Sequence, residues 1–487
     1  MQGKSCFVIA ALLTTLFASL SFADEIGFIK VAEDNWNFVD SKTGKIFTPI
    51  GCNYYDAHTG WAPNPWSRFN PQNIERDFKK MHELGVNIVR LPVLTGAPWI
   101  GIRGNRHFGY NSDTLNKLHF VVRTAEKYNI RLILSAFTWE DYPRQIGDLY
   151  TDETALRYQE FGWRIIARRL ADNPIVFSYS LMNEPRVRWE NRSMRRKWNE
   201  WLEQKYKSVD ALKAAWGNVE TDEDFGHIDV PDNAHLAGSD RLYDYQLFRE
   251  DVAYNWTSRL VKTIREVDSN HMVSLGNVQW SAPFDRDRVP SYYSSFDNQR
   301  VADLLDYISI HYYPFSPWHP ESLNWAPSDE LLTDWFYSAE AFIRYSYAGK
   351  PVVLEEFNWG LTPRGEQRGS EQANKLIARW TSTLIKKTAD SASGWVIWSF
   401  QDTPSSRDIS VAGGLVDADG DIKPLGEKFQ QLAQCLRDKQ LERSEPDVTM
   451  TLDRKSLLTS GEALEQFWAE YLDLRREGKI VDFKFEK

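Results

Sequence analysis

Short runs of β-branched and other apolar residues recur along the chain at a regular spacing. Successive runs begin roughly 35 to 45 residues apart, except for one gap of about 97 residues after the fourth run. Near-continuous apolar runs of this length are typical of strands that are buried on both faces of a sheet. The pattern predicts eight strands, at 46–53, 86–93, 130–137, 175–182, 272–276, 306–311, 351–356 and 394–400.

Amphipathic helical patterns fill most of the intervals between these strands. Apolar residues repeat three or four positions apart in segments 74–84, 115–125 and 376–384. Alternating strands and helices predict a parallel α/β sheet, and eight such units close into a (β/α)8 TIM barrel. The rival fold is an open doubly wound sheet. It usually carries a Gly-rich phosphate turn after the first strand, and Gly51-Cys-Asn-Tyr-Tyr is not such a turn.

The long gap predicts an insertion after strand four, at about 186–235. It contains one helical pattern at 194–202 and a second at 206–216, which ends at Gly217. Loops that follow barrel strands lie at the C-terminal face, where barrel enzymes build their active sites. We therefore expect the insertion to shape a substrate cleft.

The two ends of the chain differ from the barrel segment, 24–436. Residues 1–23 are typical of a signal peptide, with Lys4 near the start, an apolar run and small residues before the cleavage site at Ala23. This predicts a secreted or periplasmic protein that has no membrane association after cleavage. Residues 437–487 are rich in charge and predict a helical extension docked on the barrel or on a partner subunit. Its apolar stripe is Leu464, Phe467, Trp468, Tyr471 and Leu472.

Composition narrows the class of partner. The 487 residues include 58 basic and 68 acidic side chains, giving a net charge of −10, which argues against nucleic acid or an anionic membrane as a partner. The 20 Trp residues are numerous enough to supply exposed ring platforms for sugars as well as core. Cys52 and Cys435 remain after the predicted signal peptide. Their pairing is open, and two buried free thiols are the simpler interpretation. No His/Cys cluster has zinc-ligand spacing, so no metal is predicted.

Two of the eight strand ends carry carboxylates: Glu184 follows strand four, and the pair Glu355-Glu356 ends strand seven. Three steps around an eight-stranded barrel place these two ends roughly 135° apart, facing each other across the mouth. Opposed carboxylates are what glycoside hydrolysis requires, one to protonate the leaving oxygen and one to attack or to activate water. Adjacent strand residues point to opposite faces, so only one of Glu355 and Glu356 should face the cleft.

Five strand-end motifs resemble those of the clan A glycoside hydrolases, and family 5, which includes β-mannanases and cellulases, is the nearest match. The resemblance runs from about Ile26 to Cys435. It implies a retaining mechanism with two glutamates and no cofactor. The motifs are Val86-Asn-Ile-Val-Arg90-Leu-Pro, Leu181-Met-Asn183-Glu184-Pro185, Ile310-His311-Tyr-Tyr313-Pro, Pro351-Val-Val-Leu-Glu-Glu356-Phe357 and Trp395-Val-Ile-Trp398-Ser.

The resemblance also implies roles for single residues. Glu184 matches the general acid/base. Glu356 matches the nucleophile, because it stands directly before an aromatic residue as the nucleophile does in the family. The implied substrate-binding residues are Asn183 at the sugar 2-hydroxyl, Arg90 and Tyr313 beside the nucleophile, His311 lining the site, and Trp398 as a stacking floor.

Two further tryptophans are candidates for substrate binding. Trp139 stands after strand three, where the usual histidine of the family is absent, and Trp189 lies five residues after Glu184. The expected ligand is an oligo- or polysaccharide, with β-1,4-linked mannan or a related β-glucan as substrate. The insertion is similar to the loop after the acid/base in family 42 β-galactosidases, so an exo-acting β-galactosidase or other β-glycosidase remains the alternative. A non-catalytic carbohydrate-binding barrel is disfavoured, because both glutamates are present.

Overall fold

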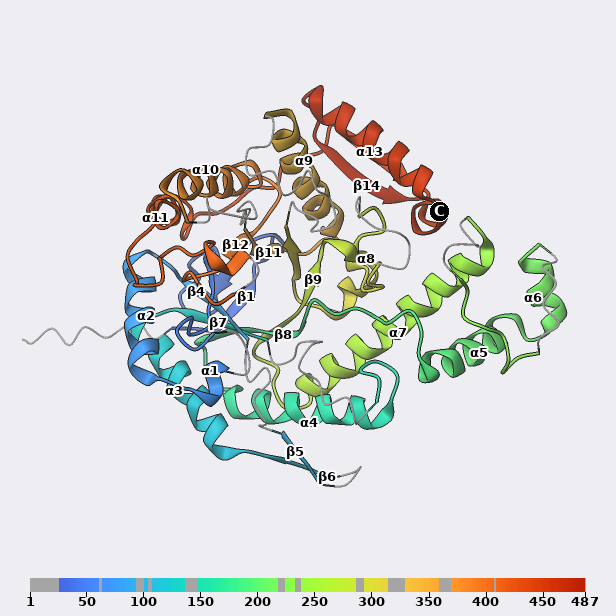
Figure 1. The fold of residues 1–487 in the computed structure, drawn as a ribbon, viewed down its shortest axis with the longest axis horizontal. Helices are drawn as coiled ribbons and strands as arrows, with labels where there is room; N and C mark the ends of the chain where they lie inside the picture. The colour runs from blue at the N-terminus through green and yellow to red at the C-terminus, as the bar shows by residue number, and fades with distance from the viewer. Residues whose placement is uncertain are drawn as a thin grey trace, which may run out of the picture.

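A computed structural model describes residues 26–60, 64–92, 100–103, 107–135, 147–217, 224–232, 238–285, 293–313, 329–358, 369–406 and 409–486. Within these ranges eight parallel strands close into a barrel (Figure 1), which confirms the predicted (β/α)8 fold. Each strand pairs with the next along the chain, and the last pairs with the first. The strands are β3 (Ile50–Asn53), β4 (Ile88–Pro92), β7 (Arg131–Ser135), β8 (Val176–Asn183), β9 (Met272–Val278), β10 (Ile308–Tyr312), β11 (Val352–Phe357) and β12 (Gly394–Ile397).

Helices surround the barrel and bury their apolar stripes against it (Figure 1). In α2 the buried stripe includes Ile74, Phe78 and Met81, as its periodicity predicts, and the Asn70 side chain caps the helix by accepting two backbone N–H groups. The long helices are α2 (Pro71–Glu83), α3 (Ser112–Tyr128), α4 (Glu153–Leu170), α7 (Asp240–Arg265), α9 (Asp329–Ser346), α10 (Glu371–Lys387) and α11 (Pro424–Leu436). Short elements are α1 (Asn64–Ser67), α8 (Asn298–Val301) and the antiparallel hairpin β5 (Ile100–Arg103) with β6 (His107–Tyr110).

An N-terminal hairpin closes the bottom of the barrel. It consists of β1 (Ile29–Val31) and β2 (Phe38–Asp40). The Phe38 ring contacts the rings of Phe177 and Tyr307 edge-on, with centroids 5.1 and 5.7 Å apart. Both partners belong to the apolar layer inside the barrel. Because this end is filled, the C-terminal strand ends are left for chemistry.

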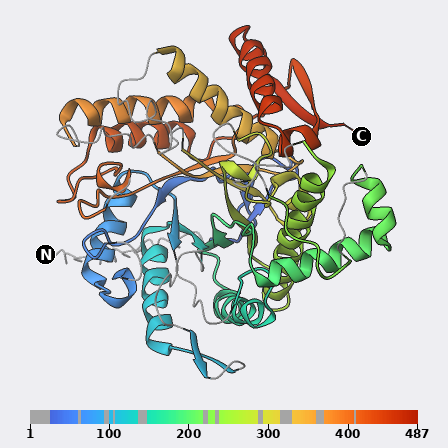
Figure 2. The ribbon, with the colours of Figure 1, turned by 45° about the vertical axis from the view of Figure 1, so that its right-hand side comes forward.

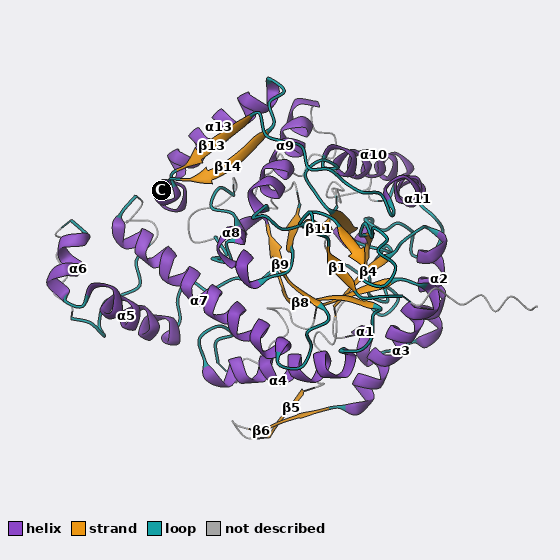
Figure 3. Ribbon diagram, turned by 180° about the vertical axis from the view of Figure 1, so that it is seen from behind, coloured by secondary structure: helices purple, strands orange, loops and turns teal. Residues whose placement is uncertain are grey.

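The segment after β8 forms two helices, α5 (Arg192–Tyr206) and α6 (Val209–Ala215), at the edge of the molecule beside α7 (Figures 1 and 3). The ring of Trp198 stacks on those of Trp201 and Trp216, with centroids 5.6 and 6.2 Å apart, and contacts Phe248 of α7. These rings therefore form a small aromatic core between the insertion and α7.

The chain after α11 is not wholly helical. It contains the parallel strands β13 (Val448–Leu452) and β14 (Val481–Phe485), with α12 (Arg454–Thr459) and α13 (Gly461–Arg476) between them. Figure 2 shows this red unit against α9. The Tyr471 hydroxyl donates to the Tyr337 carbonyl of α9 at 2.8 Å, and Arg344 pairs with Asp482 at 3.0 Å. The extension thus docks on the barrel of its own chain, and its two strands are absent from the sequence prediction.

Cys52 and Cys435, the two cysteines among the described residues, are free. Cys52 is buried in β3, whereas Cys435 is exposed on α11. The expectation of two buried thiols is wrong for Cys435, because this residue lies on the outer face of an amphipathic helix. The predicted signal peptide, 1–23, lies outside the described residues. In the part of the chain that is described, no helix combines the length and the apolar character that crossing a membrane requires.

Candidate active site

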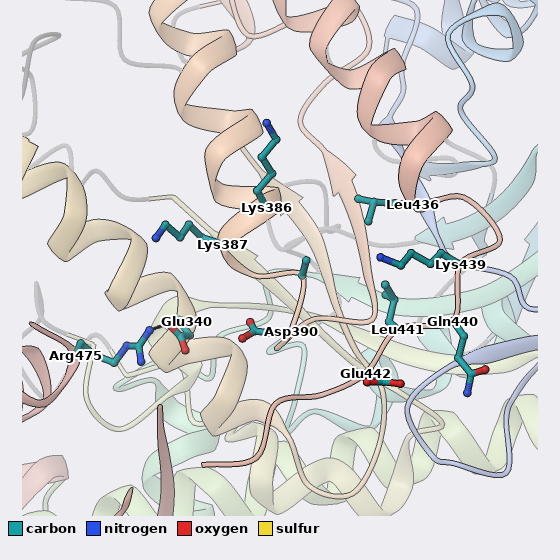
Figure 4. Close-up of a pocket in the computed structure, with 11 residues that line it drawn as sticks. Glu340, Lys386, Lys387, Asp390, Leu436, Lys439, Gln440, Leu441, Glu442 and Arg475 are labelled. Carbon is teal, nitrogen blue, oxygen red and sulfur yellow. Dashed lines mark hydrogen bonds and ion pairs between the residues drawn. The ribbon is translucent and has the colours of Figure 1, made fainter. Parts of the chain in front are cut away.

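A pocket of about 720 Å³ lies where α10 and α11 end and the C-terminal extension begins (Figure 4). Lys386, Lys387 and Asp390 line it just before β12, and Glu442 lines it after α11. The pocket is therefore at the N-terminal end of the barrel. Chemistry in this fold is carried by the opposite strand ends, so the pocket is not the candidate active site.

At the C-terminal strand ends, the structure brings the two predicted glutamates together. Glu184 follows β8, His311 is in β10, and Glu356 is in β11. One side-chain ligand atom from each of these three residues lies within 4.8 Å of the other two. His311 Nδ1 is 3.2 Å from Glu184 Oε1 and 3.4 Å from Glu356 Oε2. The histidine thus sits between the carboxylates.

Arg90 organises the floor of the cluster. Its buried guanidinium donates through Nη1 to Glu356 Oε2 and to Asn53 Oδ1, both at 2.9 Å, and through Nη2 to Asn183 Oδ1 at 2.7 Å. Asn53 in turn donates to the Glu355 carbonyl at 3.0 Å, so β3, β4, β8 and β11 are tied together. No role is predicted for Asn53 from the sequence, where it ends the apolar run 46–53. Its polar side chain at the end of an apolar strand was the available signal.

The second oxygen of Glu356 also has a donor. The Tyr313 hydroxyl donates to Glu356 Oε1 at 2.6 Å, while the Tyr313 backbone N–H donates to Gln279 Oε1 at 2.8 Å. Gln279 begins the 3-10 turn η2 (Gln279–Ser281) after β9, and no motif in the sequence marks it. With a donor on each oxygen, the Glu356 carboxylate is fixed in orientation, which suits a group that must be aimed at one carbon atom.

The strand that carries Glu355 and Glu356 is irregular. Ile310 pairs with Leu354, and the next residue, His311, pairs with Glu356, so β11 has one extra residue at Glu355. Such a β-bulge breaks the strict alternation of faces. Glu355 Oε2 lies 3.3 Å from Arg90 Nε, close to where Glu356 contacts the same guanidinium. The expectation that Glu355 and Glu356 point to opposite faces is therefore wrong.

The environments of the three titratable side chains differ. Burial raises the pKa of Glu184 to about 7, opposed by Arg90. Burial lowers the pKa of His311 to about 4, so its imidazole is neutral at mildly acidic and neutral pH. Burial also raises the pKa of Glu356 above its usual value, and the Arg90 charge and the Tyr313 hydrogen bond oppose the rise. The three side chains could offer ligands to a cation, and a carboxyl with a raised pKa beside a second carboxylate is also the pairing that acid and nucleophile roles require.

Glu184 has an unusual backbone. Its φ is 46°, in the left-handed region that side-chain-bearing residues rarely adopt, and its N–H donates to the Gly276 carbonyl at 2.8 Å. A Cβ at Gly276 would lie 2.8 Å from the Met182 carbonyl and 3.0 Å from Arg90 Nη2. Because Gly276 of β9 has no side chain, the end of β8 before Glu184 and the Arg90 guanidinium can both lie close to β9.

The three predicted aromatic contacts have different outcomes. Trp398 is partly exposed after β12, with Nε1 donating to Ser410 Oγ at 2.9 Å and its ring centroid 5.9 Å from that of Tyr55. Trp189 donates to the Pro231 carbonyl at 3.1 Å and contacts the Tyr245 ring and the Arg249 guanidinium. Its contacts are thus with α7 and the insertion rather than with the carboxylates, and its role in substrate binding stays a prediction. Trp139 lies outside the described residues.

Comparisons with known proteins agree with this geometry. Residues 48–402 match the family model "Cellulase (glycosyl hydrolase family 5)". A probable mannan endo-1,4-beta-mannosidase A-2 of Aspergillus terreus is 29% identical over 390 residues, covering 75% of this chain and 78% of the relative.

Two solved structures share the fold. An exo-beta-1,4-mannosidase from Opitutaceae bacterium strain TAV5 is 19% identical, with a TM-score of 0.62, over 94% of this chain and 72% of that chain. A beta-galactosidase from Rahnella sp. R3 is 16% identical, with a TM-score of 0.68, over 90% and 64%. The family model spans well over half of the chain, and the chain is therefore an O-glycosyl hydrolase that belongs to glycosyl hydrolase family 5.

Proposed function

We propose that this protein is an exported, retaining β-glycoside hydrolase that cleaves β-1,4-linked mannan or a related β-glucan. The main support is the short separation of the two glutamates, whose nearest oxygens lie within 4.8 Å. Retaining enzymes hold their two carboxyl groups about 5–5.5 Å apart, whereas inverting enzymes need about 6.5–9.5 Å to admit a water molecule. The mannan-cleaving relatives support mannan as substrate. The proposal of export rests on residues 1–23.

In the first step, the Glu356 carboxylate attacks the anomeric carbon while the bond to the leaving oxygen breaks. Glu184 gives its proton to that oxygen, and a glycosyl–enzyme ester forms at Glu356. In the second step, Glu184 takes a proton from water, which attacks the anomeric carbon and releases Glu356. Arg90 and Tyr313 hold Glu356 in position in both steps, so the chain supplies acid, base and nucleophile without a cofactor.

The sugar next to the scissile bond is proposed to lie over Trp398, whose partly exposed ring can stack on its apolar face. The Asn183 side chain accepts from Arg90 through its oxygen, which leaves its N–H₂ group to donate to the 2-hydroxyl. A donor at this position stabilises the transition state, because hydrogen bonds to the 2-hydroxyl strengthen as it forms.

The pH dependence should be bell-shaped, with its optimum below about pH 7. Activity requires a protonated Glu184 and an ionised Glu356. Since the pKa of Glu184 is raised to about 7, kcat/KM should fall about tenfold per pH unit above that value. The acidic limb of the profile reflects the ionisation of Glu356, whose pKa is raised by burial. Initial rates on β-1,4-linked mannan oligosaccharides, whose leaving oxygen must be protonated, measure both limbs between about pH 4 and 9. A kcat/KM that stays constant above about pH 8 would contradict the role of Glu184.

The deciding experiment is proton NMR of the first-formed product, together with a product profile. With β-mannan, β-glucan and the 4-nitrophenyl β-mannoside, β-glucoside and β-galactoside as substrates, we expect a β-anomer product and the highest kcat/KM on a β-mannoside. An initial α-anomer would overturn the double-displacement mechanism. Release of single sugars from chain ends, with preference for the galactoside, would favour the second candidate, an exo-acting β-galactosidase. The two helices that follow Glu184 are the observation behind this alternative.

A further inference from the structure

Glu355 is a buried carboxylate that the proposed mechanism does not use. Its side chain is 0% exposed. Oε2 lies 3.3 Å from Arg90 Nε, and Oε1 accepts a hydrogen bond from the Tyr307 hydroxyl at 2.7 Å. A carboxylate removed from water needs an opposite charge and a hydrogen-bond donor. Arg90 supplies the charge, and the Tyr307 hydroxyl is the donor.

The other groups that face Glu355 are uncharged at mildly acidic pH. Ser180 of β8 and Ser274 of β9 direct their hydroxyls at its oxygens from 3.5 Å. His311 Nε2 of β10 lies 4.0 Å from Oε2, and its lowered pKa keeps the imidazole neutral. Arg90 therefore supplies the positive charge among the described contacts of Glu355.

Arg90 is consequently held on three sides. Nε faces Glu355, Nη1 donates to Glu356, and Nη2 donates to Asn183. The bulge at Glu355 makes this arrangement possible, because it brings both glutamates of β11 to one guanidinium. Two anions thus share one cation directly beneath the proposed reaction centre.

We propose that Glu355 is a positioning residue that acts through Arg90. It sets the orientation of the guanidinium and how strongly the positive charge of Arg90 stabilises the ionised form of Glu356. This inference rests on the proposed function. It assigns Glu355 a part in the same reaction as Glu356, without contact with the substrate.

The charge balance gives the physical reason. Between the two limbs of the pH profile, Glu184 is protonated and His311 is neutral, so Arg90, Glu355 and Glu356 together carry one negative charge. That charge offsets the positive charge that develops on the sugar ring in the transition state. Without the charge of Glu355, Arg90 would pair with Glu356 alone. Glu356 would then be a weaker base and nucleophile.

The test is Glu355→Gln, which keeps the size of the side chain and removes its charge. We expect kcat to fall about 10- to 100-fold, with KM changed by less than about threefold, on the aryl glycoside that the wild type hydrolyses fastest. The acidic limb of kcat/KM should move to lower pH by about half a unit or more, because Glu356 then has the full charge of Arg90.

Glu340→Gln is the matched control. Glu340 of α9 is also buried, and it pairs with Arg344 at 3.0 Å and with Arg475 at 2.6 Å, away from the carboxylate cluster. Removing the charge of Glu340 should leave the pH profile the same as that of the wild type. A merely structural role for Glu355 would make the two variants alike in pH profile, and that result would overturn the proposal.

If Glu355→Gln does not fold, Tyr307→Phe provides the same test, since it removes the hydroxyl that donates to Glu355. The acidic limb should then move in the same direction by a smaller amount, and an unmoved limb would overturn the proposal. A wild type that hydrolyses none of the aryl glycosides, or that inverts configuration, is instead a failure of the proposed function.

Discussion

Replacing Glu356 with alanine should lower kcat/KM by about 10⁴-fold or more on every β-glycoside that the wild type hydrolyses. The expected loss is this large because the variant cannot form the glycosyl–enzyme ester, and water at that position is a poor substitute. Azide fits the space vacated by the carboxylate. It should restore part of the activity with activated aryl glycosides and yield the α-glycosyl azide, since only one displacement then occurs.

Glu355→Ala is the companion variant. Both residues contact Arg90, so a loss of activity alone does not separate them. Azide rescue with an inverted product does, and we expect it only for Glu356→Ala. If Glu355→Ala is the variant that azide rescues, the nucleophile has been assigned to the wrong residue of β11.

Replacing Glu184 with alanine should have an effect that depends on the leaving group. General acid catalysis typically contributes 10²- to 10⁴-fold, and we expect losses in this range for oligosaccharides, whose leaving oxygen must be protonated. A 2,4-dinitrophenyl glycoside needs no such help, so its first step should be nearly unaffected. Azide should now give the β-glycosyl azide by attacking the intermediate on Glu356.

Rates on a series of aryl glycosides of falling leaving-group pKa measure this dependence. The slope of log kcat/KM against leaving-group pKa should become steeper in Glu184→Ala than in the wild type. An equal loss for good and poor leaving groups would mean that Glu184 does not act as the acid. The alkaline limb of the pH profile should also disappear, because the group with a pKa of about 7 has been removed.

The sequence predicts the barrel well because its signals are strong and local. Apolar runs such as 175–182, separated by helical stripes, leave few alternatives to a parallel closed sheet, and each predicted run overlaps an observed barrel strand. The strand-end motifs likewise place Glu184, His311 and Glu356 at one end of the barrel. The short distances among them follow from the closure of the barrel and not from any property of a single strand.

Three features could not be predicted from the hydrophobic pattern: the bulge in β11, the strands β13 and β14, and the contact of Gln279. A bulge in β11 adds one residue to a strand that is buried on both sides, so the hydrophobic pattern around Glu355 does not register it. The strands β13 and β14 are short and lie in a highly charged segment, where helical periodicity was the stronger signal. Gln279 acts through its contact with a backbone N–H, and such a contact is visible only when β9 and β10 are in place.

The backbone conformation of Glu184 affects which substitutions evolution would favour at this position. A side chain in the left-handed region costs on the order of 1 kcal/mol, and glycine would not bear this cost. Its largely buried carboxyl adds to the cost. Because the folded-state pKa is raised to about 7, ionisation in the unfolded chain favours unfolding increasingly as the pH rises from the ordinary value of 4.5 to about 7. Stability alone would therefore favour replacing Glu184. In a lineage that no longer benefited from hydrolysis, this carboxyl would be among the first features lost, while the barrel around it persisted.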